Sequence, residues 1–286
     1  MNTVRNFGGI EPEYADAKQS AIYLQSIPYD GTSTYGKGAD KGFEAFIEAS
    51  HQLELFDIET QMEVYKKGIH LLPALGPFGS SEQMYRTVLE NTRKLLKEDR
   101  FLTFIGGEHS VSIGIMEAYK ERYDDLTILQ LDAHADLRPE YLGSPYNHAC
   151  ALHAASKYAR LIQVGIRSMD VSENEFLDPF YCYWAHEMFE SKTWIDESLR
   201  QMTDKVYITL DLDVFDPSIM PSTGTPEPGG LGWYTTLQYL ARVFEEKEVV
   251  GFDIVELAPI DGVHAPEFLV AKLYYKMLSY KFNYGI

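Results

Sequence analysis

The stretch Phe104–Asp136 begins FIGGEHS and ends ILQLDAHAD, with an amphipathic segment between, and it decides the fold. Its second apolar run, and a similar run about eighty positions later, each end directly before an acidic cluster. Residues two apart at a strand end point to the same side, so Asp132 lies with His134, and Asp211 lies with Asp213. We expect both pairs at the carboxyl ends of parallel strands, the edge at which open parallel sheets bind ligands.

Six potential metal ligands gather in and around these clusters. They are His109, Asp132, His134, Asp136, Asp211 and Asp213. Two imidazoles and four carboxylates are too many ligands for one ordinary buried site, and they suit two divalent cations. Mixed His and carboxylate ligation favours Mn²⁺, Fe²⁺, Co²⁺ or Zn²⁺ over Ca²⁺ or Mg²⁺, and the lack of a thiolate argues against a structural zinc site. A metal pair bridged by water can generate hydroxide near neutral pH, which predicts a hydrolase.

Each cluster has a simpler interpretation when it is taken alone. An Asp-x-His sequence is also typical of a turn that carries a surface histidine. Several such clusters, each placed just after an apolar strand or a Gly turn, together favour the metal site.

The rest of the chain alternates predicted strands and helices. Residues 21–31 read as a strand that runs into a Gly-rich loop, and helices are expected at about 42–54 and about 81–98, with a connection through 68–80 between them. Ser80 or Ser81 caps the second helix, and a further helix opens at His109. Further strands are expected at LIQVGI, VYITLDLDV and VVGFDIVEL. Further helices are expected at ACALHAASKYA, LQYLARVFEEK and LVAKLYYKMLSYKF. This alternation predicts an α/β fold of three layers, with a central, mostly parallel sheet flanked by helices.

Length and composition indicate a single domain over residues 1–286. The chain is 45% hydrophobic, and no linker, repeat or low-complexity tract divides it. The N-terminus MNTVRNFGGI lacks a secretory pattern, and no apolar run is long enough to span a membrane. The two cysteines, Cys150 and Cys182, fit a reducing compartment. We therefore expect a cytoplasmic protein.

The formal net charge of −18 bears on the partners of the protein. It argues against nucleic acid or an anionic membrane as a partner, because both require a basic face. An acidic surface could steer a cationic substrate toward the site, but it serves plain solubility equally well.

The motifs resemble those of the ureohydrolases, the family of arginases and agmatinases. They are GGEH at 106–109, DAHAD at 132–136, NHAC at 147–150, DLDVFDP at 211–217 and DIVELAP at 253–259. Their order and spacing match the family pattern, and the resemblance extends over nearly the whole chain. It implies an arginase-like fold, two Mn²⁺ ions held by the six ligands, and a trimer or hexamer. Asp132 and Asp211 begin their clusters in the family pattern and are the expected bridging carboxylates.

The resemblance also assigns roles to residues outside the ligand set. His148 matches the catalytic histidine that handles the proton of the leaving amine, and Glu256 matches the glutamate that pairs with the substrate guanidinium. Thr225 lies in a loop beside the pocket and could bond a substrate nitrogen. Asp170 and Glu173 could recognise a distal ammonium, or equally be solvated loop acids. Without the resemblance, His148 would be read as an inert loop histidine.

The expected substrate is agmatine, which would be hydrolysed to putrescine and urea. After DAHAD the chain continues with Leu137 and Arg138, which resembles agmatinases rather than the Asn-containing loop of arginases. Arg138 could still contact a carboxylate, so guanidinobutyrate, arginine or a formimino compound are alternatives. A non-catalytic binding protein would be expected to lose ligands. Asn147, Ala149 and Cys150 depart from the family pattern, and this bears on pocket shape but not on the metal site.

Overall fold

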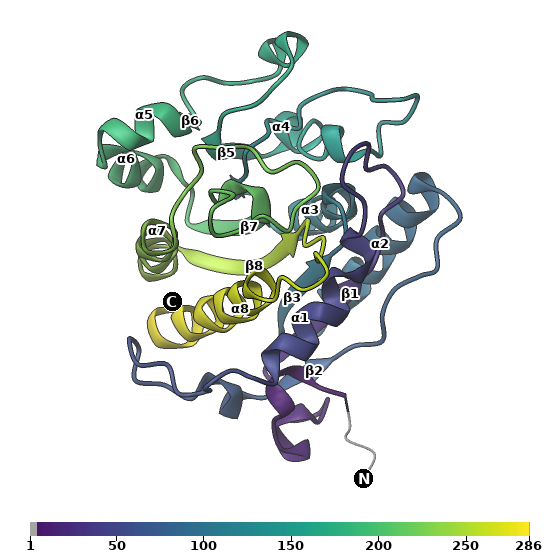
Figure 1. Cartoon of the computed structure of the whole chain (residues 1–286), viewed down its shortest axis with the longest axis vertical. Helices are drawn as coiled ribbons and strands as arrows, with labels where there is room; N and C mark the ends of the chain where they lie inside the picture. The colour runs from purple at the N-terminus through teal and green to yellow at the C-terminus, as the bar shows by residue number, and fades with distance from the viewer. Residues whose placement is uncertain (1–4, 286) are drawn as a thin grey trace.

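Eight parallel strands form one sheet at the centre of the computed structural model, which describes residues 5–285 (Figure 1). The strand order is β2-β1-β3-β8-β7-β4-β5-β6, and every pairing is parallel. The strands are β1 (Ile22–Ile27), β2 (Ile69–Leu71), β3 (Phe101–Gly106), β4 (Leu126–Leu131), β5 (Arg160–Ile166), β6 (Cys182–Trp184), β7 (Lys205–Asp211) and β8 (Glu248–Val255). The prediction of a parallel central sheet is confirmed.

Helices pack on both faces of the sheet and complete the three predicted layers. They are α1 (Gly42–Ser50), α2 (Ser81–Leu95), α3 (Ser112–Arg122), α4 (Ala155–Tyr158), α5 (Ala185–Glu190), α6 (Thr193–Gln201), α7 (Trp233–Glu246) and α8 (Ala265–Tyr284). One apolar cluster packs the sheet against α1 and α5 to α8, and a second packs it against α2, α3 and α4. The neighbours Ile128 and Leu129 of β4 belong to different clusters, as strand alternation requires.

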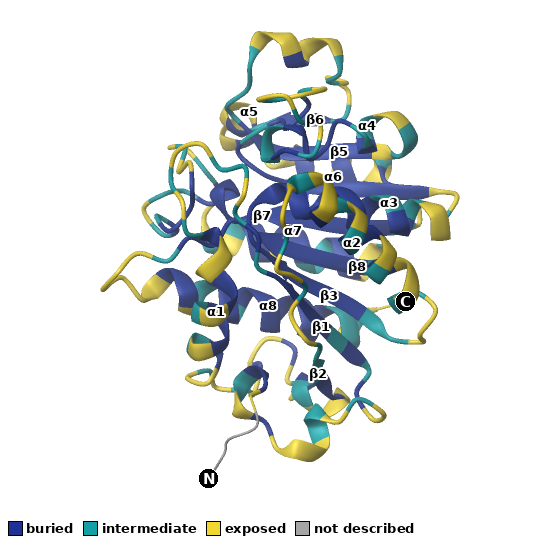
Figure 2. Cartoon of the chain, turned by 90° about the vertical axis from the view of Figure 1, so that its right-hand side faces the viewer, coloured by how far each residue is buried: buried dark blue, intermediate teal, exposed yellow. Residues whose placement is uncertain are grey.

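The central strands are buried on both sides (Figure 2). All six positions of β4 are buried, including Thr127 and Gln130. Strands that helices cover on both faces read as continuous apolar runs rather than as alternating patterns. This is why the apolar runs before the acidic clusters were informative in the sequence.

Several predicted boundaries differ from the structure. Helix α1 ends at Ser50 rather than near residue 54, because the N–H groups of His51, Gln52 and Leu53 bond to carbonyls three residues back instead of four. Helix α2 begins as predicted, with the Ser80 side chain accepting the Gln83 N–H at 3.1 Å, but it ends at Leu95.

Two further predictions of secondary structure were wrong. Within ACALHAASKYA, only Ala155–Tyr158 forms an α-helix, because the Leu152 N–H bonds to the carbonyl of Asp136 at 3.0 Å and ties the segment to the acidic loop. The region 68–80 was expected to be a connection, yet it contains the short edge strand β2. A run of three residues is too short for periodicity to reveal.

Among residues 5–285, no helix is both long enough and apolar enough to cross a membrane. The predicted domain and the reading of the N-terminus also include residues 1–4 and 286, which lie outside the described residues. The single domain and the cytoplasmic location stay predictions.

Candidate active site

The predicted ligands and Glu256 follow four adjacent strands in the middle of the sheet. The strands are β3, β8, β7 and β4, in that order, and all are parallel, so their carboxyl ends meet at one edge. His109 follows β3, Glu256 follows β8, Asp211 ends β7, and Asp132 follows β4. Parallel pairing therefore brings together residues that are far apart in the sequence.

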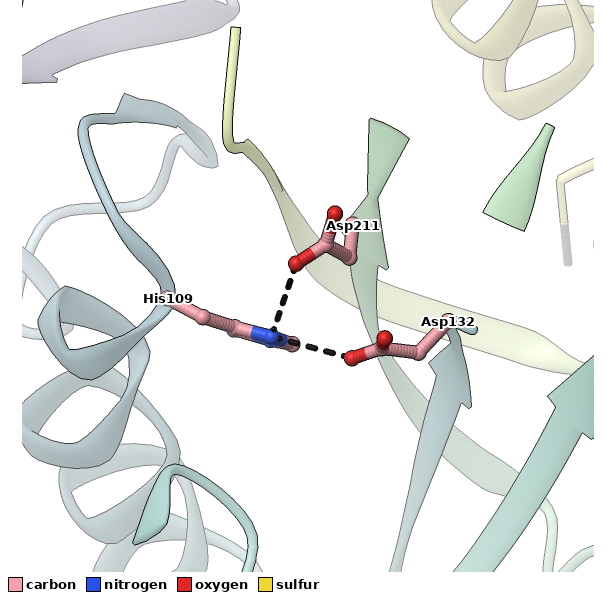
Figure 3. A group of neighbouring side chains, drawn as sticks. All are labelled: His109, Asp132 and Asp211. Carbon is pink, nitrogen blue, oxygen red and sulfur yellow. Dashed lines mark ion pairs between the residues drawn. The ribbon is translucent and has the colours of Figure 1, made fainter. Parts of the chain in front are cut away.

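His109 is the centre of the first group of potential ligands (Figure 3). Its Nδ1 atom lies 3.1 Å from Asp132 Oδ2, 3.2 Å from Asp211 Oδ2 and 3.2 Å from Asp136 Oδ2. The ring is 1% exposed, and Nδ1 makes no hydrogen bond within the described residues. Three carboxylate oxygens thus lie within 3.2 Å of one ring nitrogen.

Asp132 also belongs to a second group, with His134 and Asp213. His134 Nδ1 lies 2.9 Å from Asp213 Oδ2 and 3.7 Å from Asp132 Oδ1. The two carboxylate oxygens of Asp132 therefore face different histidines, which is the arrangement expected of a bridging carboxylate. Asp211 lies in the first group alone, so its bridging role stays a prediction.

The groups perturb the pKa values of one another strongly. Burial, followed by the charge of Asp132, raises the pKa of Asp136 to about 7. Burial would lower the pKa of His134, but Asp213 and Asp132 raise it to about 11. Burial and the neighbouring Asp213 and Asp132 carboxylates raise the pKa of Asp211 well above its ordinary value. Buried carboxylates that repel one another in this way are neutralised by bound protons or by a neighbouring cation.

The residues present fit a pair of divalent cations. The buried Nδ1 atom of His109 lacks a hydrogen bond and points at carboxylate oxygens, as a ligand nitrogen would. The two groups share Asp132 and contain five of the six predicted ligands, and Asp136 lies beside the first group, 3.2 Å from His109 Nδ1. All six offer nitrogen or carboxylate oxygen. The described residues thus contain adjoining clusters that could hold metal ions.

Backbone strain marks two of the predicted residues. Asp136 has a φ of 54° and Glu256 a φ of 69°, the left-handed region that non-glycine residues rarely adopt. This backbone conformation is unfavourable by on the order of 1–3 kcal/mol per residue, and it persists only where the surrounding structure holds it. Glu256 is held by its N–H, which donates to the Gly107 carbonyl at 2.8 Å, and by its Oε1, which accepts the His109 N–H at 2.8 Å.

A cavity of about 280 Å³ opens above the two groups. His148, Glu256, Thr225, Asp170 and Glu173 all line it. So do five of the six predicted ligands, whereas Asp132 is fully buried and does not. The structure therefore brings every predicted site residue to one cavity or directly beside it.

Comparison with known proteins agrees with this geometry. Residues 20–279 match the model of the arginase family. The chain belongs to the arginase family. It is 37% identical to the N(1)-aminopropylagmatine ureohydrolase of Synechocystis sp., over 93% of this chain and 90% of the relative. It is also 37% identical to the protein of that name from Thermus thermophilus, over 96% and 94% of the two chains.

A solved structure shares the fold of this arginase-family chain. The agmatine ureohydrolase of Thermoplasma volcanium superposes with a TM-score of 0.85 at 28% identity, covering 93% of this chain and 92% of the other. The predictions of an arginase-like fold and of an agmatinase-like hydrolase are confirmed.

His148 is half-buried and lies against residues that the sequence did not single out. Its Nδ1 is 3.1 Å from the Thr32 hydroxyl oxygen, which donates to the buried Glu108 at 2.8 Å. Burial, then the charges of His134 and His109, lower the pKa of His148 to about 4, while Asp30 opposes them. Thr32 follows β1, and no spacing pattern links it to His148.

Asp170 and Glu173 already have partners in this arginase-family protein. Asp170 Oδ1 caps a 3₁₀ helix by accepting the Ser172 N–H at 3.0 Å. The two oxygens of Glu173 accept the N–H groups of Leu137 and Asp170, each at 2.7 Å. Glu173 is 4% exposed and is therefore not a solvated loop acid. A role for either acid in substrate binding stays a prediction.

Arg138 also lines the cavity. Its guanidinium lies 3.5 Å from Asp170 and 4.0 Å from Glu173, and it stacks 4.9 Å from the centre of the Tyr141 ring. This cation is already neutralised and packed. It differs in that respect from an arginine that is free to hold a substrate carboxylate.

Arg167, which the sequence did not single out, holds the loop after β7. Its guanidinium donates to six carbonyl oxygens, among them those of Asp213 at 2.6 Å and Glu227 at 2.9 Å. Asp216 holds the same loop through the N–H groups of Ser218 and Gly229, which help to lower its pKa to about 2. Together these residues fix Asp213 against the cavity.

The departures from the family pattern near His148 have structural partners. The Asn147 side chain accepts the Ala149 N–H at 3.2 Å and so caps the 3₁₀ helix His148–Cys150. Cys150 is buried, with its Sγ 3.8 Å from the Ser144 carbonyl. Asn147 and Cys150 thus contact the backbone of the loop that carries His148.

Proposed function

We propose that this protein hydrolyses a guanidino amine to urea and a free amine, with two divalent cations held by His109, His134 and four aspartates. The observation that carries the proposal is the pair of ligand groups that share Asp132 beneath a cavity lined by His148 and Glu256. When bound, the cations would lower the pKa of a water molecule and so provide a hydroxide nucleophile near neutral pH. Mn²⁺ is the expected metal.

Glu256 is proposed to hold the substrate guanidinium. A guanidinium carbon is a poor electrophile because its charge is delocalised, so the carbon must be fixed close to its nucleophile. The N–H of His109 fixes Glu256 Oε1, so the carboxylate is anchored to the backbone of a ligand residue. A carboxylate held in this way can accept two parallel N–H groups from the substrate. Thr225 lies on the same cavity wall and could accept a further substrate N–H.

His148 is proposed to supply the proton that the leaving amine requires. After hydroxide adds to the guanidino carbon, the C–N bond to the amine breaks. The amine nitrogen takes up one proton and the hydroxyl group on the carbon gives one up, which leaves an amine and urea. With a pKa of about 4, His148 is neutral near pH 7, so it can take up the hydroxyl proton of the intermediate and pass it to the amine nitrogen.

Agmatine is the proposed substrate. The cavity wall is rich in carboxylates and suits a dication, and the similar Thermoplasma volcanium protein is an agmatine ureohydrolase. Arg138 is bound to Asp170 and packed on Tyr141, which disfavours guanidinobutyrate and arginine, because each has a carboxylate that would need a free cation.

N(1)-aminopropylagmatine is a second candidate, because the Synechocystis and Thermus relatives are named for it. Its aminopropyl extension would carry an additional positive charge toward the cavity mouth. The side chains of Asp170 and Glu227, which are 41% and 36% exposed, are carboxylates able to attract that charge. We further expect a homo-oligomer, a trimer or hexamer, in the cytoplasm.

The deciding experiment measures urea release by the Mn²⁺-loaded protein. Agmatine, N(1)-aminopropylagmatine, arginine and guanidinobutyrate are offered in parallel, with release of formamide from formiminoglutamate followed separately. Chelated protein and Glu256→Gln are the controls. Metal-dependent urea from one of the two amines alone identifies the substrate. Turnover of arginine or guanidinobutyrate would leave the mechanism standing but would contradict the argument that Arg138 is not free to bind a carboxylate. If the protein binds two metals and forms no product from any compound, the proposal is refuted.

A further inference from the structure

The hydroxyl group of Thr32 lies between a buried carboxylate and the ring of His148. Its oxygen is 2.8 Å from Glu108 Oε1, 3.1 Å from His148 Nδ1 and 3.0 Å from the backbone nitrogen of His148. Glu108 is 0% exposed. A threonine hydroxyl has one proton and two lone pairs, so three contacts use its full capacity.

The position of that proton follows from the surroundings of Glu108. Its Oε1 already accepts the Thr32 N–H at 3.2 Å, and its Oε2 accepts the Ser110 N–H at 3.1 Å, so both oxygens act as acceptors. An O–H bond to a carboxylate is stronger than one to a neutral imidazole nitrogen. The Thr32 proton therefore points at Glu108, and both lone pairs of Thr32 remain for N–H donors of His148.

We infer that Glu108 and Thr32 form a positioning pair that holds the proton of His148 on Nδ1 and leaves Nε2 to exchange protons in the cavity. The inference rests on the proposed function only in giving His148 the role of proton donor. Both the neutral ring and the imidazolium ion carry a proton on Nδ1 in this arrangement. The Thr32 hydroxyl thus accepts the Nδ1–H of His148 throughout the catalytic cycle. It need not rotate while His148 exchanges its Nε2 proton.

The positioning pair is rigid because two loops meet at it. The Glu108 N–H donates to the Tyr29 carbonyl at 2.8 Å, and a Cβ on Gly107 would lie 1.9 Å from that carbonyl oxygen. The loop after β1, which carries Thr32, is therefore pressed against the loop after β3. Because Glu108 is the neighbour of His109, the pair also fixes the His148 ring relative to the first ligand group. Asp30, His109 and His134 are the other charged groups that influence this ring.

The first test reads the tautomer of His148 directly. The ¹⁵N chemical shifts of the ring would be measured in the full-length protein carrying diamagnetic Zn²⁺, and again without metal, at a pH of about 8.5, two units above the ordinary imidazole pKa. We expect a proton on Nδ1 in the wild type and in Thr32→Ser, which keeps the hydroxyl. Thr32→Val should lose this preference. A wild-type ring protonated on Nε2, or a tautomer that Thr32→Val leaves unchanged, would overturn the inference.

The second test separates positioning from substrate binding. Thr32→Val should lower kcat on the order of tenfold or more with KM nearly unchanged, whereas Thr32→Ser should retain most of the activity. Ser33→Ala is the matched control, because the neighbouring Ser33 hydroxyl has no hydrogen-bond partner within the described residues. Thermal unfolding of each variant reports loss of fold. If no substrate is turned over, the proposed function fails while the tautomer result still decides the inference.

Discussion

The hydroxyl oxygen of Thr209 lies 2.9 Å from Nε2 of His109. The same hydroxyl donates its proton to Asp253 Oδ1 at 2.7 Å, and Asp253 Oδ2 accepts the Tyr207 hydroxyl at 2.7 Å. Thr209 must therefore accept from an Nε2–H, which leaves a lone pair on Nδ1 of His109 toward the carboxylates. A hydrogen bond behind a histidine of this kind fixes the nitrogen that binds a metal.

The first prediction is that Thr209→Val weakens metal binding. The change keeps the shape of the side chain but leaves His109 Nε2 and Asp253 without their common partner. Affinity for the first metal should fall roughly 10–100-fold, as metal titration calorimetry would measure. Thr209→Ser is the matched control and should bind nearly as the wild type does. Equal affinities in the valine and serine variants would contradict the role of Thr209.

Asp132 is the residue that the two ligand groups share, so Asp132→Asn should remove both metals. The carboxamide loses the charge that both groups need. Its single oxygen can keep only one of the two hydrogen bonds that Asp132 accepts, which come from Gln130 Nε2 and the His134 N–H. We expect loss of bound metal and of activity, with an unchanged circular dichroism spectrum. Asp125→Asn, at an exposed aspartate directly before β4, should retain its metal. A fully metallated, active Asp132→Asn enzyme would refute the bridging assignment.

The fold and the gathering of the candidate ligands could be predicted because both follow from local rules. Each acidic cluster comes directly after a buried apolar strand, and parallel strands place their carboxyl ends at one edge. Thr209 was also within reach: it lies two residues before Asp211 in β7 and therefore points to the same side. Its role depends on Asp253, which is opposite it in β8, and the register of two distant strands is not visible in one sequence.

The residues behind His148 were not predictable in this way. Thr32, Glu108 and His148 come from three loops, and only the packed structure brings their polar atoms together. Glu108 did carry a signal, since a glutamate between a Gly pair and a ligand histidine in an apolar stretch has to be buried with partners. The sequence around Arg167 gave a weaker signal, because an arginine that follows a strand is usually a surface residue.

Lys276 of α8 is predicted to be a major contributor to stability. Its Nζ lies 3.0 Å from Asp57, and the two side chains are 5% and 2% exposed. Burial tends to raise the pKa of Asp57, but bonds from Thr60 and Lys276 outweigh it and leave the pKa lowered. Lys276→Met should therefore lower the free energy of unfolding by about 3–5 kcal/mol at neutral pH, because it leaves a buried charge unpaired.

The loss of stability in Lys276→Met should depend on pH, because the pKa of Asp57 is lowered in the folded state. A lowered pKa in the folded state contributes stability above the unfolded pKa of about 3.9, and the contribution is lost as the pH falls through the folded value. The difference between wild type and Lys276→Met in urea unfolding should thus shrink below about pH 4. Lys272→Met, one helical turn earlier, serves as the control and should have a small effect. A penalty for Lys276→Met that is independent of pH would point to lost packing instead.

His148→Phe is predicted to lower kcat by roughly 10²–10⁴, because the leaving amine would have to take its proton from water. The phenyl ring retains the volume and the edge contact with Tyr141, so KM and stability should change little. His186→Phe, an exposed histidine of α5, is the control and should match the wild type. The His148→Phe rate should also lose any pH dependence that the imidazole imposes on kcat. Unchanged kinetics in this variant would return His148 to the class of inert loop histidines, and the tautomer held by Thr32 would then be structural only.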